Sequence, residues 1–192
     1  MIFLRILVET SARHIHLCKE DLYKLFGKDY TLNKRKDLSQ PGQFASEEKI
    51  TIRGSKSEIN NVSVLGPLRE KTQVEISLTD CRKLGIEPIL KESGDLQGSS
   101  GCILIGPKGE VKLKEGVIVP KRHIHLDPKS SEIFNLSDGK AVKVKIDTND
   151  RSLIFDDVIV RVSSKFLPAM HIDTDESNAA GITGEVFGEV LI

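Results

Sequence analysis

The pentapeptide Arg-His-Ile-His-Leu occurs twice in this chain, at residues 13–17 and again 109 residues later at 122–126. An internal repeat indicates two related structural units rather than one continuous core. The length of 192 residues suffices for one large core or two small ones, because domains commonly hold about 100 to 150 residues. We therefore expect two compact halves.

The five histidines all lie in three short motifs, the two repeats and Met170-His171-Ile172-Asp173. In a β-strand, residues two apart point to the same side, whereas in a helix they diverge by roughly 200°. Each His-x-His pair on a strand can therefore direct two imidazoles at one ion. A single pair is often accidental or packed in a core, but two copies that hold four of the five histidines favour metal binding.

Zinc commonly has three or four His, Cys or carboxylate ligands, and a site with three protein ligands leaves a position open for substrate. If the two histidine pairs form two sites, His171 can complete only one, and a carboxylate should complete the other. Glu75 is the preferred candidate because it stands among apolar residues of a strand-like segment, where an unpaired charge would be unfavourable. The sequence leaves open the alternatives Glu20, Glu47, Glu48 and the thiol of Cys18.

The composition excludes several classes of protein. Lys plus Arg and Asp plus Glu both number 28, so the formal net charge is zero, which disfavours nonspecific binding to nucleic acid or anionic membranes. The apolar runs are too short to span a bilayer, and the first nine residues are typical of a strand rather than a signal peptide. Three widely spaced cysteines fit reduced thiols. We expect a cytoplasmic protein.

Short, β-branched and often alternating segments predominate. They predict strands at residues 49–53, 61–65, 73–77, 102–105, 110–114, 116–119, 141–147, 152–155 and 158–162. Gly106 to Gly109 should turn a hairpin. Helices are expected at 19–27, after Asp127 and Pro128, and at 79–85 with Thr79 as N-cap and Gly85 at the end. Many short strands with few helices predict small barrels or sandwiches.

Electrostatics indicates the class of substrate. Two Zn²⁺ ions held by neutral imidazoles and one carboxylate would form a centre of charge about +3, which favours anions such as phosphate and thiolate. Arg69 lies six residues before Glu75, so both side chains share one face if the strand extends that far. Its guanidinium could hold phosphate oxygens in a bidentate manner.

Eight ordered motifs, which span nearly the whole chain, give it a strong resemblance to a known family. The chain resembles the phosphate propanoyltransferases of the propanediol-utilisation type, which are phosphotransacylases unrelated in fold to the more familiar phosphotransacetylases. The motifs lie at residues 11–17, 38–43, 65–69, 72–77, 92–96, 116–119, 122–125 and 170–181.

The resemblance implies a set of site residues. Two zinc ions are implied, one held by His14, His16 and Glu75 with an open position for the coenzyme A sulfur, and one held by His123, His125 and His171. Arg69 is implied to bind phosphate and to serve catalysis. Coenzyme A contacts are implied for Thr10, Ser11, Ala12, Lys56 and Asn178. Family members can carry an arginine where Ser63 stands here, so one contact to the nucleotide is expected to be missing.

The fold that the resemblance implies consists of two small β-barrels with short helices, in which the first strand joins the C-terminal barrel. Residues 1–12 and 121–192 then form one domain with the second metal motif, and residues 13–120 form the other with the first motif, the metals lying between them. Members packed into microcompartments usually carry an extra amphipathic N-terminal peptide. The chain starts at the first strand, so we expect a free cytoplasmic enzyme; the sequence leaves homo-oligomerisation open.

The implied reaction is reversible transfer of a short acyl group, propanoyl or acetyl, between coenzyme A and phosphate. Zinc would stabilise the thiolate, the second zinc and Arg69 would hold phosphate, and no protein nucleophile is needed. Three alternatives compete with it. They are a dizinc hydrolase of a thioester or other anionic substrate, a cupin that uses His14, His16 and Glu20, and a noncatalytic zinc-binding protein.

Overall fold

The computed structural model describes residues 4–191 and divides into two compact units, which are treated separately here. Unit 1 comprises Met1–Ser11 and Lys121–Ile192, and unit 2 comprises Ala12–Pro120. Each unit therefore holds one copy of the repeated pentapeptide, and the chain passes from one unit to the other one or two residues before each copy.

Unit 2 contains a closed ring of six strands in the order β4-β5-β2-β6-β9-β8. The strands are β2 (His14–His16), β4 (Phe44–Arg53), β5 (Glu58–Gly66), β6 (Gln73–Glu75), β8 (Ser100–Ile105) and β9 (Glu110–Pro120). Short strands β3 (Lys34–Asp37) and β7 (Leu90–Lys91) pair with β4 and β9. Two helices, α1 (Lys19–Phe26) and α2 (Leu78–Leu84), complete the unit.

The core of unit 2 follows from the alternation of its strands. Ile50 and Ile52 of β4 and Val62 and Val64 of β5 are buried while their neighbours are more exposed, as a strand with one face toward a core requires. Leu22 of α1 packs against the same cluster. These side chains fill the interior of the ring, in which the three residues of the short strand β2 are all buried.

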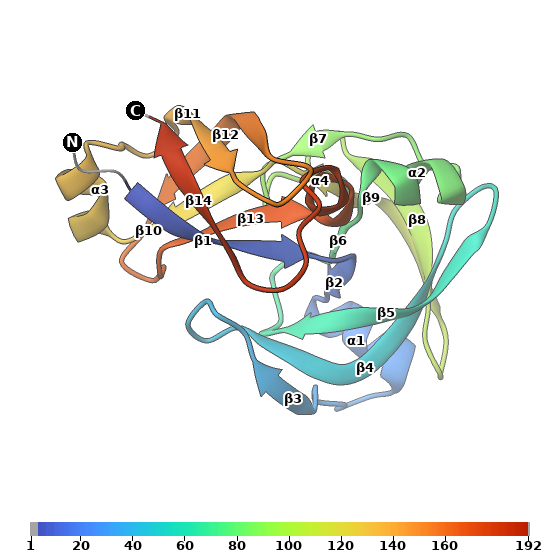
Figure 1. Ribbon diagram of the computed structural model, residues 1–192. Coiled ribbons are helices and arrows are strands. Elements are labelled where there is room, and N and C mark those ends of the chain that lie inside the picture. Colours follow the sequence, from blue (N-terminus) through green and yellow to red (C-terminus); the bar gives the residue numbers. More distant parts are fainter. Residues whose placement is uncertain (1–3, 192) are drawn as a thin grey trace. The chain divides into compact units, whose positions relative to one another are not determined.

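Unit 1 is a closed barrel in the order β1-β13-β10-β12-β11-β14. Its strands are β1 (Leu4–Ser11), β10 (His123–Leu126), β11 (Ala141–Ile146), β12 (Leu153–Val162), β13 (Ala169–Asp173) and β14 (Val186–Leu191), and its helices are α3 (Pro128–Phe134) and α4 (Thr174–Ala179). Figure 1 shows β1, drawn in blue, among the orange and red strands of the C-terminal part. The predicted mainly β fold, with the first strand in the C-terminal barrel, is confirmed.

The two units share one plan of strand pairing. In each ring the strand with the His-x-His pair lies parallel to one neighbour, β5 or β12, and antiparallel to the other, β6 or β13. The next pairing, β6 with β9 or β13 with β1, is again parallel, and the remaining pairings are antiparallel. Strand β1 thus fills in unit 1 the place that β9 fills in unit 2. The duplication read from five residues therefore extends to the whole ring.

Several local predictions need correction. Strands β9 and β12 were each predicted as two separate strands but are single strands. In each of them, a residue with an irregular backbone conformation lies within the strand instead of ending it. In β12 this residue is Asp157, whose φ of 53° leaves it in the left-handed region. The N-cap of α2 is Ser77 and not Thr79, since the Ser77 side chain accepts a hydrogen bond from the Asp80 amide. Strands β3, β7, β13 and β14 and helix α4 were not predicted.

Helix α1 lies close to its predicted limits, helix α3 begins at the predicted residue, and the hairpin at Gly106 to Gly109 joins β8 to β9. Among residues 4–191, no helix has the length and apolar character needed to cross a membrane.

Candidate active site

The first group of candidate ligands lies in unit 2, on two adjacent strands. His14 of β2 is directly opposite Glu75 of β6 in the antiparallel ladder, and His16 is two residues further along β2 on the same side. The ligand atoms of these three residues all lie within 4.8 Å of one another, and all three residues are buried. The structure therefore brings together the three residues that the sequence proposed, whereas Glu20, Glu47, Glu48 and Cys18 are not in this group.

Hydrogen bonds determine which nitrogen of His14 faces its neighbours. Nδ1 of His14 donates to the Ala12 carbonyl at 2.9 Å, which leaves Nε2 at 3.4 Å from Oε2 of Glu75. Burial alone would lower the pKa of His14, but the Glu75 carboxylate outweighs it and raises that pKa. Burial would likewise raise the pKa of Glu75, yet the neighbouring histidines hold it well below its usual range. A neutral His14 would turn a lone pair toward the carboxylate, an arrangement that requires a proton or a cation between them.

His16 is the third member of the group. Its Nε2 accepts a hydrogen bond from Nη2 of Arg69 at 2.8 Å, so Nδ1 has the proton when the ring is neutral. Burial, followed by the charges of His14 and Arg69, holds the pKa of His16 well below its usual value. A buried ring that stays neutral keeps the lone pair on Nε2, which accepts from Arg69 here and is the form of histidine that binds a metal.

Arg69 enters this site from a loop and not from a strand. Strand β6 begins only at Gln73, so the prediction that Arg69 shares a strand face with Glu75 is wrong. The loop is fixed instead by the Arg69 amide, which donates to the Leu17 carbonyl at 2.9 Å. At the start of this loop, a Cβ on Gly66 would lie 2.1 Å from the Phe44 ring, so this position requires glycine.

The second group of candidate ligands lies entirely in unit 1. His123 and His125 of β10 lie beside His171 of β13, with His123 and His171 directly opposite each other in the ladder. The ligand atoms again lie within 4.8 Å of one another. The ring centroids are 4.7 Å apart for His123 and His125, and 4.8 Å apart for His125 and His171.

Neighbouring groups orient these rings. Nδ1 of His123 donates to the Lys121 carbonyl at 2.8 Å, which repeats the contact between His14 and the carbonyl two residues before it. Nδ1 of His171 lies 3.7 Å from a carboxylate oxygen of Glu9, and the His125 ring stacks on Phe166 with centroids 3.9 Å apart. A carboxylate behind a histidine and a ring against its face are the supports expected around metal ligands.

The arginine that precedes each histidine pair makes the same contact in both units. Nε of Arg13 lies 2.8 Å from Oδ2 of Asp80, and Nη1 of Arg122 lies 3.1 Å from Oε1 of Glu176. Each carboxylate is the third residue of a helix, α2 or α4, that starts just after the third candidate ligand, Glu75 or His171. These pairs, together with Glu9 and Phe166, were not predicted from the sequence. The arginine at the start of both repeats was the signal that could have revealed them.

The residues proposed to contact coenzyme A fall in both units. In unit 1, Thr10 and Ser11 end β1, and the Thr10 hydroxyl donates to Ser177 at 2.8 Å, next to Asn178 in α4. In unit 2, Ala12 precedes β2, and Lys56 lies exposed in the turn between β4 and β5.

A cationic side chain lies next to the neutral side chain of Ser63. Ser63 lies opposite His14 in the pairing of β2 with β5, and Nζ of Lys49 donates to its hydroxyl at 2.7 Å. A positive charge is therefore available beside this residue.

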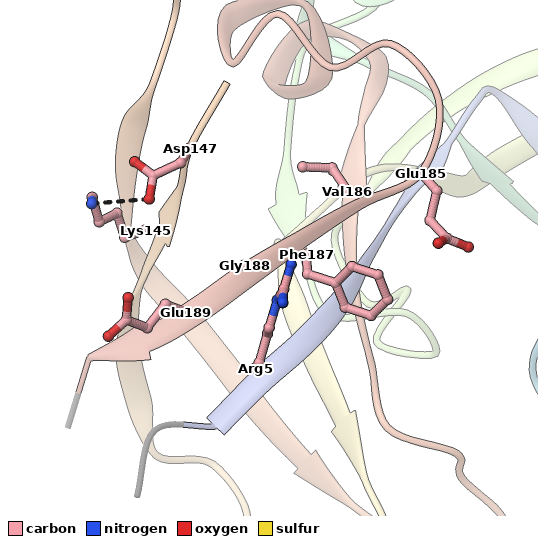
Figure 2. Close-up of a pocket in the computed structure, with 8 residues that line it drawn as sticks. All are labelled: Arg5, Lys145, Asp147, Glu185, Val186, Phe187, Gly188 and Glu189. Carbon is pink, nitrogen blue, oxygen red and sulfur yellow. Dashed lines mark ion pairs between the residues drawn. The ribbon is translucent and has the colours of Figure 1, made fainter. Parts of the chain in front are cut away.

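A pocket of about 520 Å³ lies elsewhere in unit 1 and contains none of the proposed site residues. Figure 2 shows its charged side chains, with Lys145 paired to Asp147 and Arg5 beside Phe187. Three carboxylates and two cations line it, which leaves it net negative. An anionic substrate would be repelled, so we do not assign the reaction to this pocket.

Comparison with known proteins identifies the family. A family model described as phosphate propanoyltransferase matches residues 7–183. A phosphate propanoyltransferase of Thermotoga maritima is 50% identical over 182 residues, which cover 94% of this chain and 87% of the relative. One of Clostridioides difficile is 51% identical over 184 residues, covering 96% and 88%.

The chain belongs to the phosphate propanoyltransferase family. A relative of the same name in Listeria monocytogenes is 50% identical and covers 96% of this chain and 86% of its own length. Membership makes this protein an enzyme of the acyltransferase class. The region matched to the phosphate propanoyltransferase model includes both groups of candidate ligands and Arg69.

Proposed function

We propose that this protein transfers a short acyl group reversibly between coenzyme A and inorganic phosphate, with propanoyl-CoA or acetyl-CoA as the thioester. The observation that carries this proposal is the family match over residues 7–183, a range that includes both three-ligand groups and the arginine beside one of them. In the proposed reaction, a phosphate oxygen forms a bond to the acyl carbon as the carbon–sulfur bond breaks. The coenzyme A thiolate then leaves and takes up a proton.

We propose two zinc ions per chain as cofactors. One would be held by His14, His16 and Glu75, and the other by His123, His125 and His171. The low pKa of buried His16, which keeps its ring neutral, and the position of Oε2 of Glu75 next to Nε2 of His14 support the first set, and three clustered histidines support the second. Zinc supplies Lewis acidity, which stabilises a thiolate and polarises a carbonyl.

The chain's own residues would bind and orient the substrates. Arg69 presents a planar cation beside His16, and its guanidinium suits the oxygens of a phosphate group. By holding phosphate through charge-assisted hydrogen bonds, Arg69 would offset repulsion between the phosphate and the thioester oxygen. No nucleophilic side chain is needed, because phosphate and the thiolate are themselves the nucleophiles of the two directions.

Coenzyme A binding is proposed for Thr10, Ser11, Ala12, Lys56 and Asn178. Lys49 adds a cation next to Ser63, where relatives can carry an arginine. Its ammonium group would compensate for part of the missing contact to a nucleotide phosphate.

The test of this function is the release of thiol from propanoyl-CoA and from acetyl-CoA by zinc-loaded protein, with and without phosphate. We expect thiol release that requires phosphate and forms the acyl phosphate. Thiol release of equal rate without phosphate would instead identify a hydrolase, and no release from either thioester would identify a binding protein.

Arg69→Met provides the matched loss-of-function variant. We expect its kcat/KM to fall by about 100-fold, because a charge-assisted contact to the reacting phosphate is lost. Arg53→Met is the control, since Arg53 of β4 pairs with Glu58 and Glu110 and not with the candidate ligands. Its activity should stay within about twofold of the wild type.

A further inference from the structure

The hydroxyl group of Ser93 connects two residues to which the proposed reaction assigns different tasks. Ser93 lies in the loop between β7 and β8, and its Oγ donates to Oε1 of Glu75 at 2.8 Å. The same Oγ accepts from Nη1 of Arg69 at 3.0 Å and from Nε2 of Gln73 at 2.9 Å. Ser93 therefore touches both the candidate metal ligand and the candidate phosphate-binding arginine.

The direction of each hydrogen bond follows from the chemistry of the partners. A serine hydroxyl has one proton and two acceptor positions. Arg69 and Gln73 can only donate through these nitrogen atoms, so the Ser93 proton must go to Glu75. All three positions are then in use, and rotation of the hydroxyl would break at least one bond.

Gln73 holds Ser93 in this orientation. Its carbonyl Oε1 accepts from the Gly94 amide at 2.9 Å, which fixes the two ends of the side-chain amide. Its Nε2 donates to both Ser93 and Oε1 of Glu75. Gln73 is only 1% exposed, and its side chain connects the 92–94 loop to β6 through Ser93 and Gly94.

The consequence for Glu75 is an asymmetric carboxylate. Oε1 receives two donors, Ser93 and Gln73, whereas Oε2 points to His14 at 3.4 Å. The two donors occupy Oε1 and leave Oε2 as the oxygen available to a cation. The consequence for Arg69 is that Nη1 is held by Ser93, whereas Nη2, which donates to Nε2 of His16 here, would be released for phosphate oxygens when His16 holds a metal.

We propose that Ser93 is a positioning residue that sets Glu75 as a ligand through one oxygen and orients Arg69 for phosphate. This inference deepens the proposed function and rests on it for the roles of Glu75 and Arg69. The Ser93 hydroxyl would then couple the affinity for metal to the affinity for phosphate in unit 2.

The test compares Ser93→Ala with Ser93→Thr, which keeps the hydroxyl, and with Ser99→Ala. Ser99 is a matched control in the same connection between β7 and β8: its hydroxyl donates to the Leu96 carbonyl at 2.7 Å and accepts from the Gly116 amide at 2.8 Å. Neither partner is a candidate ligand or Arg69, so loss of the Ser99 hydroxyl reports the structural cost of removing a buried serine hydroxyl.

The first readout is zinc affinity, measured by competition with a chromogenic chelator and independent of turnover. We expect Ser93→Ala to lower the affinity for one of the two zinc ions by roughly 10-fold or more, as loss of a residue that supports a ligand commonly does. The second readout is the KM for phosphate, which should rise roughly tenfold through loss of a charged hydrogen bond, while the KM for acyl-CoA changes less than twofold. Ser93→Thr should restore both, and Ser99→Ala should change neither.

Wild-type zinc affinity together with a wild-type KM for phosphate in Ser93→Ala would overturn the proposal, as would equal changes in Ser93→Ala and Ser99→Ala. If the wild type shows no acyl transfer, the proposed function fails. The zinc competition still tests the contact of Ser93 with Glu75. Calorimetric titration of zinc-loaded protein with inorganic phosphate tests its contact with Arg69. The two failures are therefore distinguishable.

Discussion

Individual buried side chains show how this protein separates charge from its apolar cores. Glu75 is 7% exposed, and a carboxylate so placed must be compensated by donors or cations. It has donors on one oxygen and His14 opposite the other. The charge of Glu75 is therefore directed toward one point, which is the position we assign to zinc.

Cys102, unlike Glu75, is a buried titratable group that stays uncharged. It is 6% exposed in β8, and burial raises the pKa of its thiol to about 12. At pH 8 the thiolate, which is the reactive form, would be on the order of one molecule in ten thousand. We predict that iodoacetamide at pH 8 leaves Cys102 unmodified in the native protein and modifies it in denaturant, as measured by peptide mass spectrometry. Rapid modification of native Cys102 would contradict this account of its burial.

At the scale of elements, each of the two arginine–carboxylate pairs connects one histidine-bearing strand to the helix that follows the third candidate ligand of the same unit. Asp80 is 2% exposed, so removal of Arg13 leaves a buried carboxylate with weaker compensation. We predict that Arg13→Met lowers the free energy of unfolding by about 2 kcal/mol, since Arg13 is itself partly solvated. Arg122→Met should lower it less, because Glu176 is more exposed than Asp80.

Chemical denaturation followed by circular dichroism measures both effects. Arg82→Met, on an exposed position of α2, is the control and should unfold as the wild type does. Equal stability of Arg13→Met and Arg82→Met would show that the pair does not hold β2 to α2.

Elements with a strong local pattern could be predicted from the sequence. Helix α3 begins at Pro128 with Asp127 as its N-cap, a combination that is typical of a helix start, and each His-x-His pair lies on a strand as expected. Helix α4 was missed because it has only six residues and its capping box, Asp173 with Glu176, lies inside the third histidine motif. The loop position of Arg69 depends on tertiary contact with Leu17, which no local pattern contains.

The candidate ligands were predictable because histidine is rare in this chain and gathers in the repeats. Glu75 was preferred because its neighbours are apolar, but only the family resemblance distinguished it from the other glutamates. The role of Ser93 could not be predicted, because its three partners come from positions 18 to 24 residues earlier in the chain.

At the scale of the whole molecule, one plan of strands and helices occurs twice with a different third ligand. Glu75 contributes a negative charge in unit 2, whereas His171 in the equivalent place contributes none. Counting only a divalent ion and its three ligands, the charge would be about +2 in unit 1 and about +1 in unit 2, and Glu9 in unit 1 and Arg69 in unit 2 reduce this difference. The duplicated frame therefore gives the two proposed sites different ligand sets.

The central claim is that each unit holds its own metal ion, and zinc content by elemental analysis tests it most directly. The wild type, His14→Ala/His16→Ala and His123→Ala/His125→Ala would be loaded with zinc, freed of excess metal on a chelating resin and compared at equal, folded concentration. We predict about two zinc ions per chain in the wild type and about one in each variant. A wild type without zinc, or a variant that keeps both ions, would contradict the account.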